Sequence, residues 1–407
     1  MAGSLLRPAW ASAISCSLAP ALDATILQVI PELETGGAER TTLEVAEAVI
    51  RAGGRAVVVS QGGPLVAPLE ALGARHITLP MASKNPLTMY LNAGRLARLV
   101  AAEGADLIHA RSRAPAWSAW RAAQQTGVPF ITTYHGIYKA RSKWKRRYNS
   151  VMARGDYVIA NSDFTRSNVL TEHYPDPLRD PARLITIHRG ADLRRFDPEG
   201  VEPARLAALE DAWQGGSALK VLLPGRLTSW KGQKALIEAA QILRVSDPEL
   251  DFRFVLAGSA QGRDNYRADL ESAIAKGDVG HMVILPGNCS DMAAAYKWAD
   301  IGISASTRPE AFGRVAIEAQ AMGRPVIATA HGGAMETVVD GVTGYLVPPG
   351  DATALAHAIS GFAEMPDRER QDMGARARRH AETNFSIEKM TDATLNVYMK
   401  ALSGKNR

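Results

Sequence analysis

Cysteine is scarce in this chain, which has only Cys16 and Cys289 among its 407 residues. The two cysteines lie far apart and without metal-ligand spacing, which argues against a disulfide framework and favours a reducing, cytoplasmic location. No apolar run approaches the roughly 18 residues that a membrane-spanning helix needs. The formal net charge is only +5, whereas a dedicated nucleic-acid-binding protein is strongly basic across a whole domain. We therefore expect no nucleic-acid partner.

The rest of the composition is that of an ordinary globular protein, with 46% hydrophobic and 22% charged residues. The length exceeds that of one typical domain, so two domains of roughly 150 to 200 residues are expected. Residues 1–23 differ from the rest, because the small-residue run Trp10–Ala21 is interrupted by serines and Pro20. This run lacks the apolar centre of a signal peptide. We expect a leader or an added surface segment there, with secretion as the alternative.

Short apolar strands alternate with helical stretches along the remaining chain. This alternation predicts an α/β fold, with doubly wound parallel sheets covered by helices on both faces. The rhythm restarts after the polar segment Phe196–Gly216, which predicts a linker leading to a second domain. The expected organisation is a Rossmann-like domain over residues 24–200, a second over 201–384, and a C-terminal segment, 385–407, whose helix packs back on the first domain. The expected strands include Ala24–Ile30, Arg55–Ser60, His76–Pro80, Asp106–Ala110, Pro129–Tyr134, Tyr157–Ala160, Leu184–Ile187, Lys220–Pro224, Phe252–Ala257, Val283–Leu285, Ala299–Ser304 and Val326–Thr329.

The stretch Ser306–Gly333 is the most informative part of the sequence. It begins after an apolar strand, passes through a Pro-Glu-Ala-Phe-Gly turn, and continues into a helix expected over Arg314–Met322. Ligands bind beyond the carboxyl ends of parallel strands, where a helix N-terminus offers unpaired N–H groups to an anion. Glu310 and Glu318 flank this helix start, which suits a ligand carrying phosphate and hydroxyl groups. Taken singly, each acid is more typical of a solvated surface.

Two basic side chains follow the strand expected over Lys220–Pro224. Arg226 and Lys231 lie five residues apart in a glycine-bounded turn. They could converge on a diphosphate, Arg226 through a bidentate contact and Lys231 as a point charge, although the pair alone is more typical of surface cations. In the first domain, the pair Gly36-Gly37 would let backbone approach a ligand closely, or form a plain tight turn. His135 stands at the carboxyl end of a strand, a good position to meet a ligand.

The segment from Tyr138 to Tyr148 combines six basic residues with three aromatic residues and no acid. Such interleaving is found at anionic membrane surfaces, at anionic substrates and on nucleic-acid-binding proteins. One isolated cluster in a nearly neutral chain argues against nucleic acid. A solvated helix face and a patch for a membrane or an acceptor remain equal alternatives.

Taken in this order, the features resemble the GT-B glycosyltransferases and, within them, glycosyltransferase family 4. The resemblance covers about Ala24 to Leu402, and its most specific part is the E-x7-E pattern from Glu310 to Glu318. It implies two Rossmann-like domains that face a cleft, with a nucleotide sugar held mainly by the second and an acceptor mainly by the first. The supporting motifs are Gly36-Gly37 with Glu39-Arg40, His135-Gly136, Asn161-Ser162, Gly190 to Asp192, Gly225-Arg226 with Lys231-Gly232, and Gly332-Gly333.

The resemblance also implies roles for individual residues. Glu318 would accept hydrogen bonds from ribose hydroxyls and Glu310 would contact the donor sugar, while the backbone of Phe312–Val315 would hold the diphosphate. The residues implied to act in transfer are His135, Arg226, Lys231 and Glu310. Those implied to bind the nucleotide sugar are Gly36, Gly37, Gly258, Asn288, Phe312, Gly313, Arg314, Val315 and Glu318.

The chemistry implied is sugar transfer without a metal ion or other cofactor. Cleaving a glycosyl phosphate leaves a dianionic nucleoside diphosphate, so cations and N–H groups placed in advance lower the barrier. Many enzymes use Mg²⁺ for this task, but this sequence has no Asp-x-Asp motif, and Arg226 and Lys231 beside a helix start can replace the ion. The resemblance implies retention of anomeric configuration by front-face attack, so Glu310 need not be a nucleophile.

The expected function is therefore that of a retaining glycosyltransferase acting on a glycan or glycolipid, in bacterial surface polysaccharide or lipopolysaccharide biosynthesis. Its expected location is the cytoplasm, either free or peripheral on the inner face of the membrane through residues 138–148. A nucleotide-sugar epimerase or a sugar phosphorylase on the same fold is the first alternative. A non-catalytic nucleotide-sugar-binding scaffold is the second, and is disfavoured because the charged residues of the site are all present. The sequence leaves the sugar, nucleotide, acceptor and linkage open.

Overall fold

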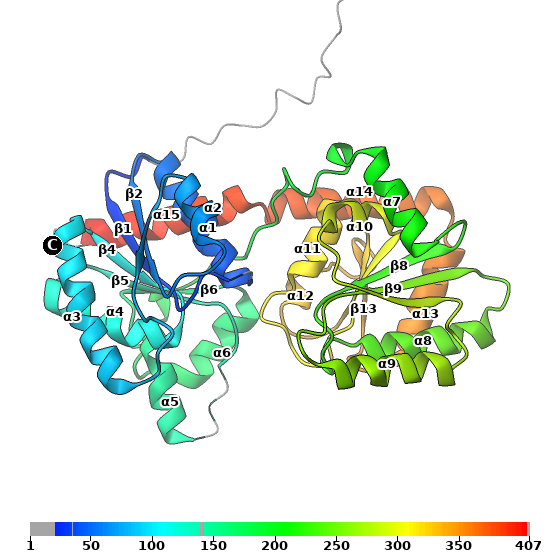
Figure 1. The fold of residues 1–407 in the computed structure, drawn as a ribbon, viewed down its shortest axis with the longest axis horizontal. Helices are drawn as coiled ribbons and strands as arrows, with labels where there is room; N and C mark the ends of the chain where they lie inside the picture. Colours follow the sequence, from blue (N-terminus) through cyan, green and yellow to red (C-terminus); the bar gives the residue numbers. More distant parts are fainter. Residues whose placement is uncertain (1–20, 35, 139, 141, 405–407) are drawn as a thin grey trace, which may run out of the picture.

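The structure is a computed structural model that describes residues 21–34, 36–138, 140 and 142–404. It contains two α/β domains side by side, each built on its own parallel sheet (Figure 1). Most of the predicted leader, including Cys16, lies outside the described residues, as do two positions of the basic segment 138–148.

The first sheet has seven parallel strands in the order β3-β2-β1-β4-β5-β6-β7. All five residues of its interior strand β1 are buried, as expected for a sheet that helices cover on both faces. Its strands are β1 (Thr25–Val29), β2 (Arg55–Ser60), β3 (Arg75–Thr78), β4 (Leu107–Ala110), β5 (Phe130–Tyr134), β6 (Tyr157–Ala160) and β7 (Leu184–Thr186). Its helices are α1 (Gly37–Arg51), α2 (Val66–Ala71), α3 (Pro86–Glu103), α4 (Arg113–Thr126), α5 (Lys143–Asn149) and α6 (Asp163–His173), and short 3-10 turns cover Ser150–Ala153 and Pro181–Arg183.

The second sheet has six parallel strands in the order β10-β9-β8-β11-β12-β13. Its strands are β8 (Leu219–Pro224), β9 (Phe252–Ala257), β10 (Val283–Gly287), β11 (Ile301–Ser304), β12 (Val326–Thr329) and β13 (Gly344–Val347). Its helices are α7 (Pro203–Trp213), α8 (Gln233–Ser246), α9 (Asp264–Lys276), α10 (Met292–Trp298), α11 (Arg314–Ala321), α12 (Ala334–Thr337), α13 (Ala352–Glu364) and α14 (Asp367–Asn384). The predicted fold of two doubly wound parallel sheets is therefore confirmed.

The segment Phe196–Gly216, expected as the linker and approach to the second domain, packs on the core of that domain. It holds a 3-10 turn, Pro198–Gly200, and helix α7. Trp213 at the end of α7 is buried, with its ring centre 5.0 Å from that of Trp298, and Phe196 packs 6.0 Å from the ring of Tyr296. Polar residues of α7 bond to the rest of this domain, because Nε of Arg205 donates to the Asp291 carboxylate at 2.7 Å and Glu210 accepts from the Trp298 indole N–H at 2.8 Å.

The last helix, α15 (Ile387–Ser403), crosses back to the first domain, as predicted (Figure 1). Its apolar face, including Leu395 and Tyr398, joins a core cluster with strand β1 and helix α1. The Tyr398 hydroxyl lies 2.6 Å from Nδ1 of His109, a fully buried histidine on β4. The chain passes between the domains twice, near Ala191 and near Phe385. These two segments are hydrogen-bonded to each other, because the Ala191 N–H donates to the Phe385 carbonyl at 2.7 Å.

Candidate active site between the two domains

The strand order of each sheet reverses at one point, between β1 and β4 in the first and between β8 and β11 in the second. In open parallel sheets, ligands bind outside the carboxyl ends of the strands at such a switch point. The loop after β8 carries Arg226 and Lys231, and the loop after β11 carries Glu310. Topology alone therefore brings these three side chains to the same crevice of the second domain.

Lys231 and Glu310 form an ion pair there. The ammonium of Lys231 lies 2.8 Å from Oε1 of Glu310, and the side chains are only 14% and 20% exposed. The Ser306 hydroxyl donates to the same carboxylate oxygen, and the Lys231 ammonium also lies 4.8 Å from the centre of the Trp230 ring. Glu310 is thus held in place, with acceptor capacity to spare for a ligand hydroxyl.

Arg226 lies at the same strand end with its side chain exposed. Its backbone is fixed, because its carbonyl accepts a hydrogen bond from the Gln233 side chain at 3.0 Å. An exposed guanidinium on a fixed backbone is suited to reach a phosphate.

Helix α11 begins next to this ion pair. Gly313 precedes the helix with φ 89°, a left-handed conformation that favours glycine. The first-turn amides of Arg314 and Val315 have no intrahelical acceptor, and a helix start of this kind can donate to an anion. The Phe312 side chain is buried against His188 and Phe385, at ring-centre distances of 5.9 and 5.7 Å. Phe312 can therefore offer a ligand only its backbone.

Glu318 lies on the second turn of α11. The Tyr296 hydroxyl donates to it at 3.3 Å, and Nε of Arg314 lies 3.4 Å away. Burial, followed by the nearby Glu318 carboxylate, raises the pKa of Tyr296 well above its usual value, so the hydroxyl stays a donor. The carboxylate is 17% exposed and can accept hydrogen bonds from a pair of neighbouring hydroxyls.

Gly258 and Asn288 lie on neighbouring loops of the second domain. A Cβ on Gly258 would come within 1.8 Å of the Gly225 carbonyl oxygen, and the Gly258 N–H donates to the Gly287 carbonyl at 2.7 Å. The close packing of these loops thus explains why position 258 is a glycine, and no ligand is needed to explain it. Asn288 is exposed.

On the first domain, His135 is held by an arginine that the sequence analysis did not select. Arg189 donates to Nδ1 of His135 at 2.9 Å. Burial, followed by the charge of Arg189, holds the pKa of His135 well below its usual value, so the ring is neutral. Because Nδ1 is the acceptor, the proton of the neutral ring sits on Nε2. That buried Nε2 has no partner among the described residues, so it is an N–H available to a ligand.

Arg189 also approaches Gly37 and the second domain. A Cβ on Gly37 would lie 2.6 Å from Nη1 of Arg189 and 3.7 Å from Cδ of Arg314, whereas one on Gly36 would meet the Glu39 carboxylate. Burial, and then the charge of Arg314, lowers the pKa of Arg189 to about 10, so it remains charged at neutral pH. Two guanidinium groups from opposite domains therefore meet beside the glycine pair.

Glu44 of helix α1 is the second residue that the sequence analysis missed. It lies 3.8 Å from Nη2 of Arg314, so it links the domains. Burial raises its pKa, and Arg314 and Arg189 oppose that shift. Within the described part of the chain, several buried polar atoms around this interface have no partner, which is typical of a site that holds a polar ligand or water. They are Glu44 Oε2, Arg111 Nη2, His135 Nε2, Arg189 Nε and Arg314 Nη1.

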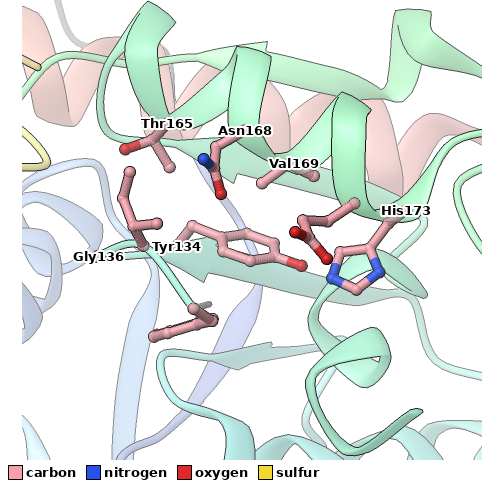
Figure 2. A pocket seen from close by; sticks show the side chains of 9 residues that line it. Tyr134, Gly136, Thr165, Asn168, Val169 and His173 are labelled. Carbon is pink, nitrogen blue, oxygen red and sulfur yellow. The ribbon is translucent and has the colours of Figure 1, made fainter. Parts of the chain in front are cut away.

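A small pocket lies beside Gly136, under helix α6 (Figure 2). The Tyr134 ring crosses it, and the view shows the ring extending toward His173. Its volume of about 10 Å³ is that of a single water molecule. The pocket is therefore too small for a sugar.

The chain matches two family models. The model described as "Glycosyltransferase Family 4" covers residues 35–195, and the model described as "Glycosyl transferases group 1" covers residues 215–380. The two matches fall on the first and second domains respectively.

Curated relatives include proteins named D-inositol 3-phosphate glycosyltransferase. The one from Salinispora tropica is 34% identical over 320 residues, which is 73% of this chain and 64% of that protein. The one from Salinispora arenicola is 33% identical over 318 residues, which is 73% of this chain and 69% of that protein. The chain thus spans slightly less than two thirds of the first of these relatives.

Solved structures resemble both domains together. A glycosyltransferase from Rickettsia africae has a TM-score of 0.85 and 36% identity, and the match covers 93% of this chain and 99% of that one. Anabaena HepE, solved with UDP-glucose, has a TM-score of 0.78 at 23% identity and covers 93% of this chain and all of its own length. At 23% identity, the match to HepE shows only a shared fold. With both family models, these relatives and the E-x7-E pattern in agreement, the chain belongs to the GT-B glycosyltransferases of family 4.

Proposed function

We propose that the chain transfers a sugar from a nucleotide-diphosphate sugar to a hydroxyl of an acceptor, with retention of configuration. The observation that carries this proposal is the Lys231–Glu310 ion pair, which lies at the switch point of the second sheet beside the start of α11. A cation, an anion-binding helix start and a fixed carboxylate are the three groups needed to hold a phosphorylated sugar by both of its ends.

Each group then has a defined task. Glu318 accepts hydrogen bonds from the ribose, and the amides of Arg314 and Val315 hold the diphosphate. Arg226 and Lys231 stabilise the charge that develops on the leaving phosphate. These cations perform the task without a metal ion, as the missing Asp-x-Asp motif also predicts.

Transfer requires that the Lys231–Glu310 pair open. When a diphosphate enters, Lys231 exchanges the carboxylate for a phosphate oxygen, and Glu310 becomes available to hydroxyls of the donor sugar. Glu310 thus orients the sugar and need not attack it. His135, neutral and with its Nε2–H unpaired within the described residues, donates a hydrogen bond to the sugar from the first domain. The leaving phosphate takes the acceptor's proton.

We assign the acceptor to the first domain and to an anionic class. Arg189 and Arg111 on this domain carry buried polar atoms without partners among the described residues. The relatives' name points to a phosphorylated polyol as one such acceptor, and a bacterial surface glycan or an anionic glycolipid, as in lipopolysaccharide biosynthesis, is the other. Transfer assays with inositol phosphate and with lipid-linked glycans in parallel would separate the two.

We further propose that the chain works in the cytoplasm, against an anionic membrane surface. Trp144 on α5 is 83% exposed, and Leu87 and Tyr90 on α3 are 66% and 60% exposed. Trp144 and Arg147 line both of two adjoining grooves, of about 450 and 650 Å³, whose other cations include Lys84, Arg121, Lys143 and Arg146. Exposed apolar side chains among cations fit anionic headgroups. Within the described residues, no helix is long and apolar enough to cross a bilayer.

A cosedimentation assay tests the membrane proposal. The triple variant Lys143→Gln, Trp144→Ala and Lys145→Gln should lose binding to phosphatidylglycerol vesicles. Val245→Ala, at an apolar side chain of the second domain that is 73% exposed, should keep it. Equal binding by both variants, or by wild type to neutral vesicles, would contradict the proposal.

The donor is tested by thermal shift with a panel of nucleotide sugars, starting from UDP-glucose. A ligand at about 100 times its dissociation constant adds roughly 2.7 kcal/mol to the free energy of unfolding. Donor consumed only in the presence of acceptor supports transfer. Donor consumed without acceptor indicates an epimerase, and consumption that depends on phosphate indicates a phosphorylase. Binding of a nucleotide sugar without any turnover would indicate the non-catalytic scaffold.

A further inference from the structure

One carboxylate of the second domain is bound to three donors of the first. Glu336, on helix α12, accepts hydrogen bonds from the backbone N–H groups of Asp163 at 2.7 Å and Phe164 at 2.8 Å. Its Oε2 also lies 2.8 Å from Nε2 of His188. In Figure 1, α12 lies at the boundary between the domains, on the side where α6 lies. None of the site assignments above uses this contact.

The chemistry of the contact makes it specific. The two amides belong to the first turn of α6, an 11-residue helix whose N-terminal N–H groups have no intrahelical acceptor. The carboxylate supplies both the missing acceptors and a negative charge at the positive end of the helix dipole. Burial opposes ionisation of Glu336, but the hydrogen bonds from His188 and the two amides prevail and lower its pKa. The residue is therefore a charged carboxylate held by three donors.

On the second domain, α12 is fixed to the loop that carries the donor-binding groups. The Gly333 N–H donates to the Glu310 carbonyl at 2.9 Å. A Cβ on Gly333 would lie 2.3 Å from Cα of Phe312, so the start of α12 packs directly on that loop. The Thr165 hydroxyl of α6 also reaches the Ala311 carbonyl, at 3.5 Å. The loop that carries Glu310 is thus in contact with both α12 and α6.

On the first domain, the partners of Glu336 are joined to the groups that face the donor. His188 immediately precedes Arg189, which holds His135. Asp163 and Phe164 follow Ser162, whose hydroxyl caps α6 by accepting from the Thr165 N–H at 2.9 Å. The three donors to Glu336 therefore lie on the segments that follow β6 and β7, and β6 pairs with β5, the strand that His135 follows.

We propose that Glu336 is a positioning residue for the transfer reaction. By binding both the start of α6 and His188, it aligns two half-sites: the donor-binding groups of the second domain, and His135 with Arg189 on the first. With it in place, a sugar held by the second domain meets His135 in a reactive arrangement. Without it, each half-site stays intact but the two are no longer aligned. This inference rests on the proposed function, and its test is chosen so that it can be judged separately.

The variant Glu336→Gln keeps the shape of the side chain but loses the charge and places an NH2 group against the N–H donors. The matched control is Glu364→Gln, at an exposed glutamate that ends α13. We expect kcat to fall at least about tenfold, with nucleotide affinity within about twofold of wild type, because Glu318 and the start of α11, to which the nucleotide is assigned, both lie on the second domain. Amide hydrogen exchange of the peptide containing Asp163 and Phe164 should accelerate by about tenfold. The control should leave all three quantities unchanged.

A double-mutant cycle with His188→Gln completes the test. If Glu336 acts partly through His188, the combined loss in kcat is smaller than the product of the single losses. Unchanged kcat, a loss in nucleotide affinity equal to the loss in kcat, or unchanged amide exchange in Glu336→Gln would overturn the proposal. So would Zn²⁺ raising the melting temperature of wild type but not of the variant, because Asp163, His188 and Glu336 would then hold a metal. The exchange measurement needs no turnover, so it still reports on the contact if no donor supports transfer.

Discussion

The Lys231 ammonium lies 2.8 Å from Oε1 of Glu310, so the cation proposed for the phosphate and the acid proposed for the sugar neutralise each other in this structure. Each therefore protects the other from the cost of an unpaired, largely buried charge. Ligand binding must exchange this contact for two others, and the exchange is the step that substitutions here will affect.

Replacing Lys231 with Met should cut transfer by about 100- to 1,000-fold, the loss expected when one group that stabilises the developing phosphate charge is removed. Nucleotide affinity should also fall. Single-turnover kinetics would measure the first effect and titration calorimetry with the nucleoside diphosphate the second. The matched control is Lys234→Met, at a nearby lysine whose side chain is exposed. Transfer at the wild-type rate in Lys231→Met would rule out its proposed role.

Replacing the two acids of the E-x7-E pattern one at a time should affect different steps. Glu318→Ala removes acceptors for two ribose hydroxyls, and hydrogen bonds to a charged group are worth about 1.5 to 3 kcal/mol each. Loss of even one such bond should therefore lower the affinity for the nucleotide alone by at least about tenfold. Glu310→Ala should leave that affinity nearly intact and reduce transfer. Titration calorimetry of both variants with the nucleotide would measure these affinities. A loss of nucleotide affinity in Glu310→Ala but not in Glu318→Ala would show that the ribose and sugar assignments must be exchanged.

The sequence was sufficient for features that depend on neighbouring residues. The alternation of strands and helices predicted both sheets, and the helix expected over Arg314–Met322 is observed over Arg314–Ala321. The missed contacts join residues that are distant in the chain. Arg189 reaches His135 across 54 positions and Glu336 reaches Asp163 across 173. Such pairs carry no local pattern, because only the folded chain brings them together: the first lies within the first domain, and the second joins the two domains.

Acid should destabilise the protein through His173. Burial lowers its pKa to about 4, from 6.5. Between these pH values the unfolded chain binds a proton that the folded chain does not, so stability falls as pH decreases from 6.5 to about 4, by up to about 1 kcal/mol per pH unit. Urea unfolding of wild type and His173→Asn across this window should show a shallower pH dependence in the variant. Parallel curves would mean that His173 titrates normally.

The crossing helix α15 should depend on its buried tyrosine. Tyr398→Phe leaves Nδ1 of His109 without the partner it has at 2.6 Å, and an unsatisfied buried polar atom costs about 1 to 3 kcal/mol. The free energy of unfolding should fall by that amount. Tyr90→Phe, at a tyrosine 60% exposed, should change it little. Equal stability of the two variants would show that water replaces the hydroxyl.

A methyl group at Gly37 should disturb the site without weakening the fold. The new Cβ would lie 2.6 Å from Nη1 of Arg189, so the guanidinium must move and lose its contact with His135. Transfer should fall by at least tenfold, the order of effect expected when a positioned donor shifts by about 1 Å. In Gly94→Ala, a Cβ meets no atom within 4 Å, and this glycine lies within helix α3, so stability should rise by about 0.5 to 1 kcal/mol. Kinetics and thermal unfolding of the pair thus separate steric displacement of Arg189 from the general effect of replacing a glycine. Full activity in Gly37→Ala would show that the position of Arg189 is not needed for transfer.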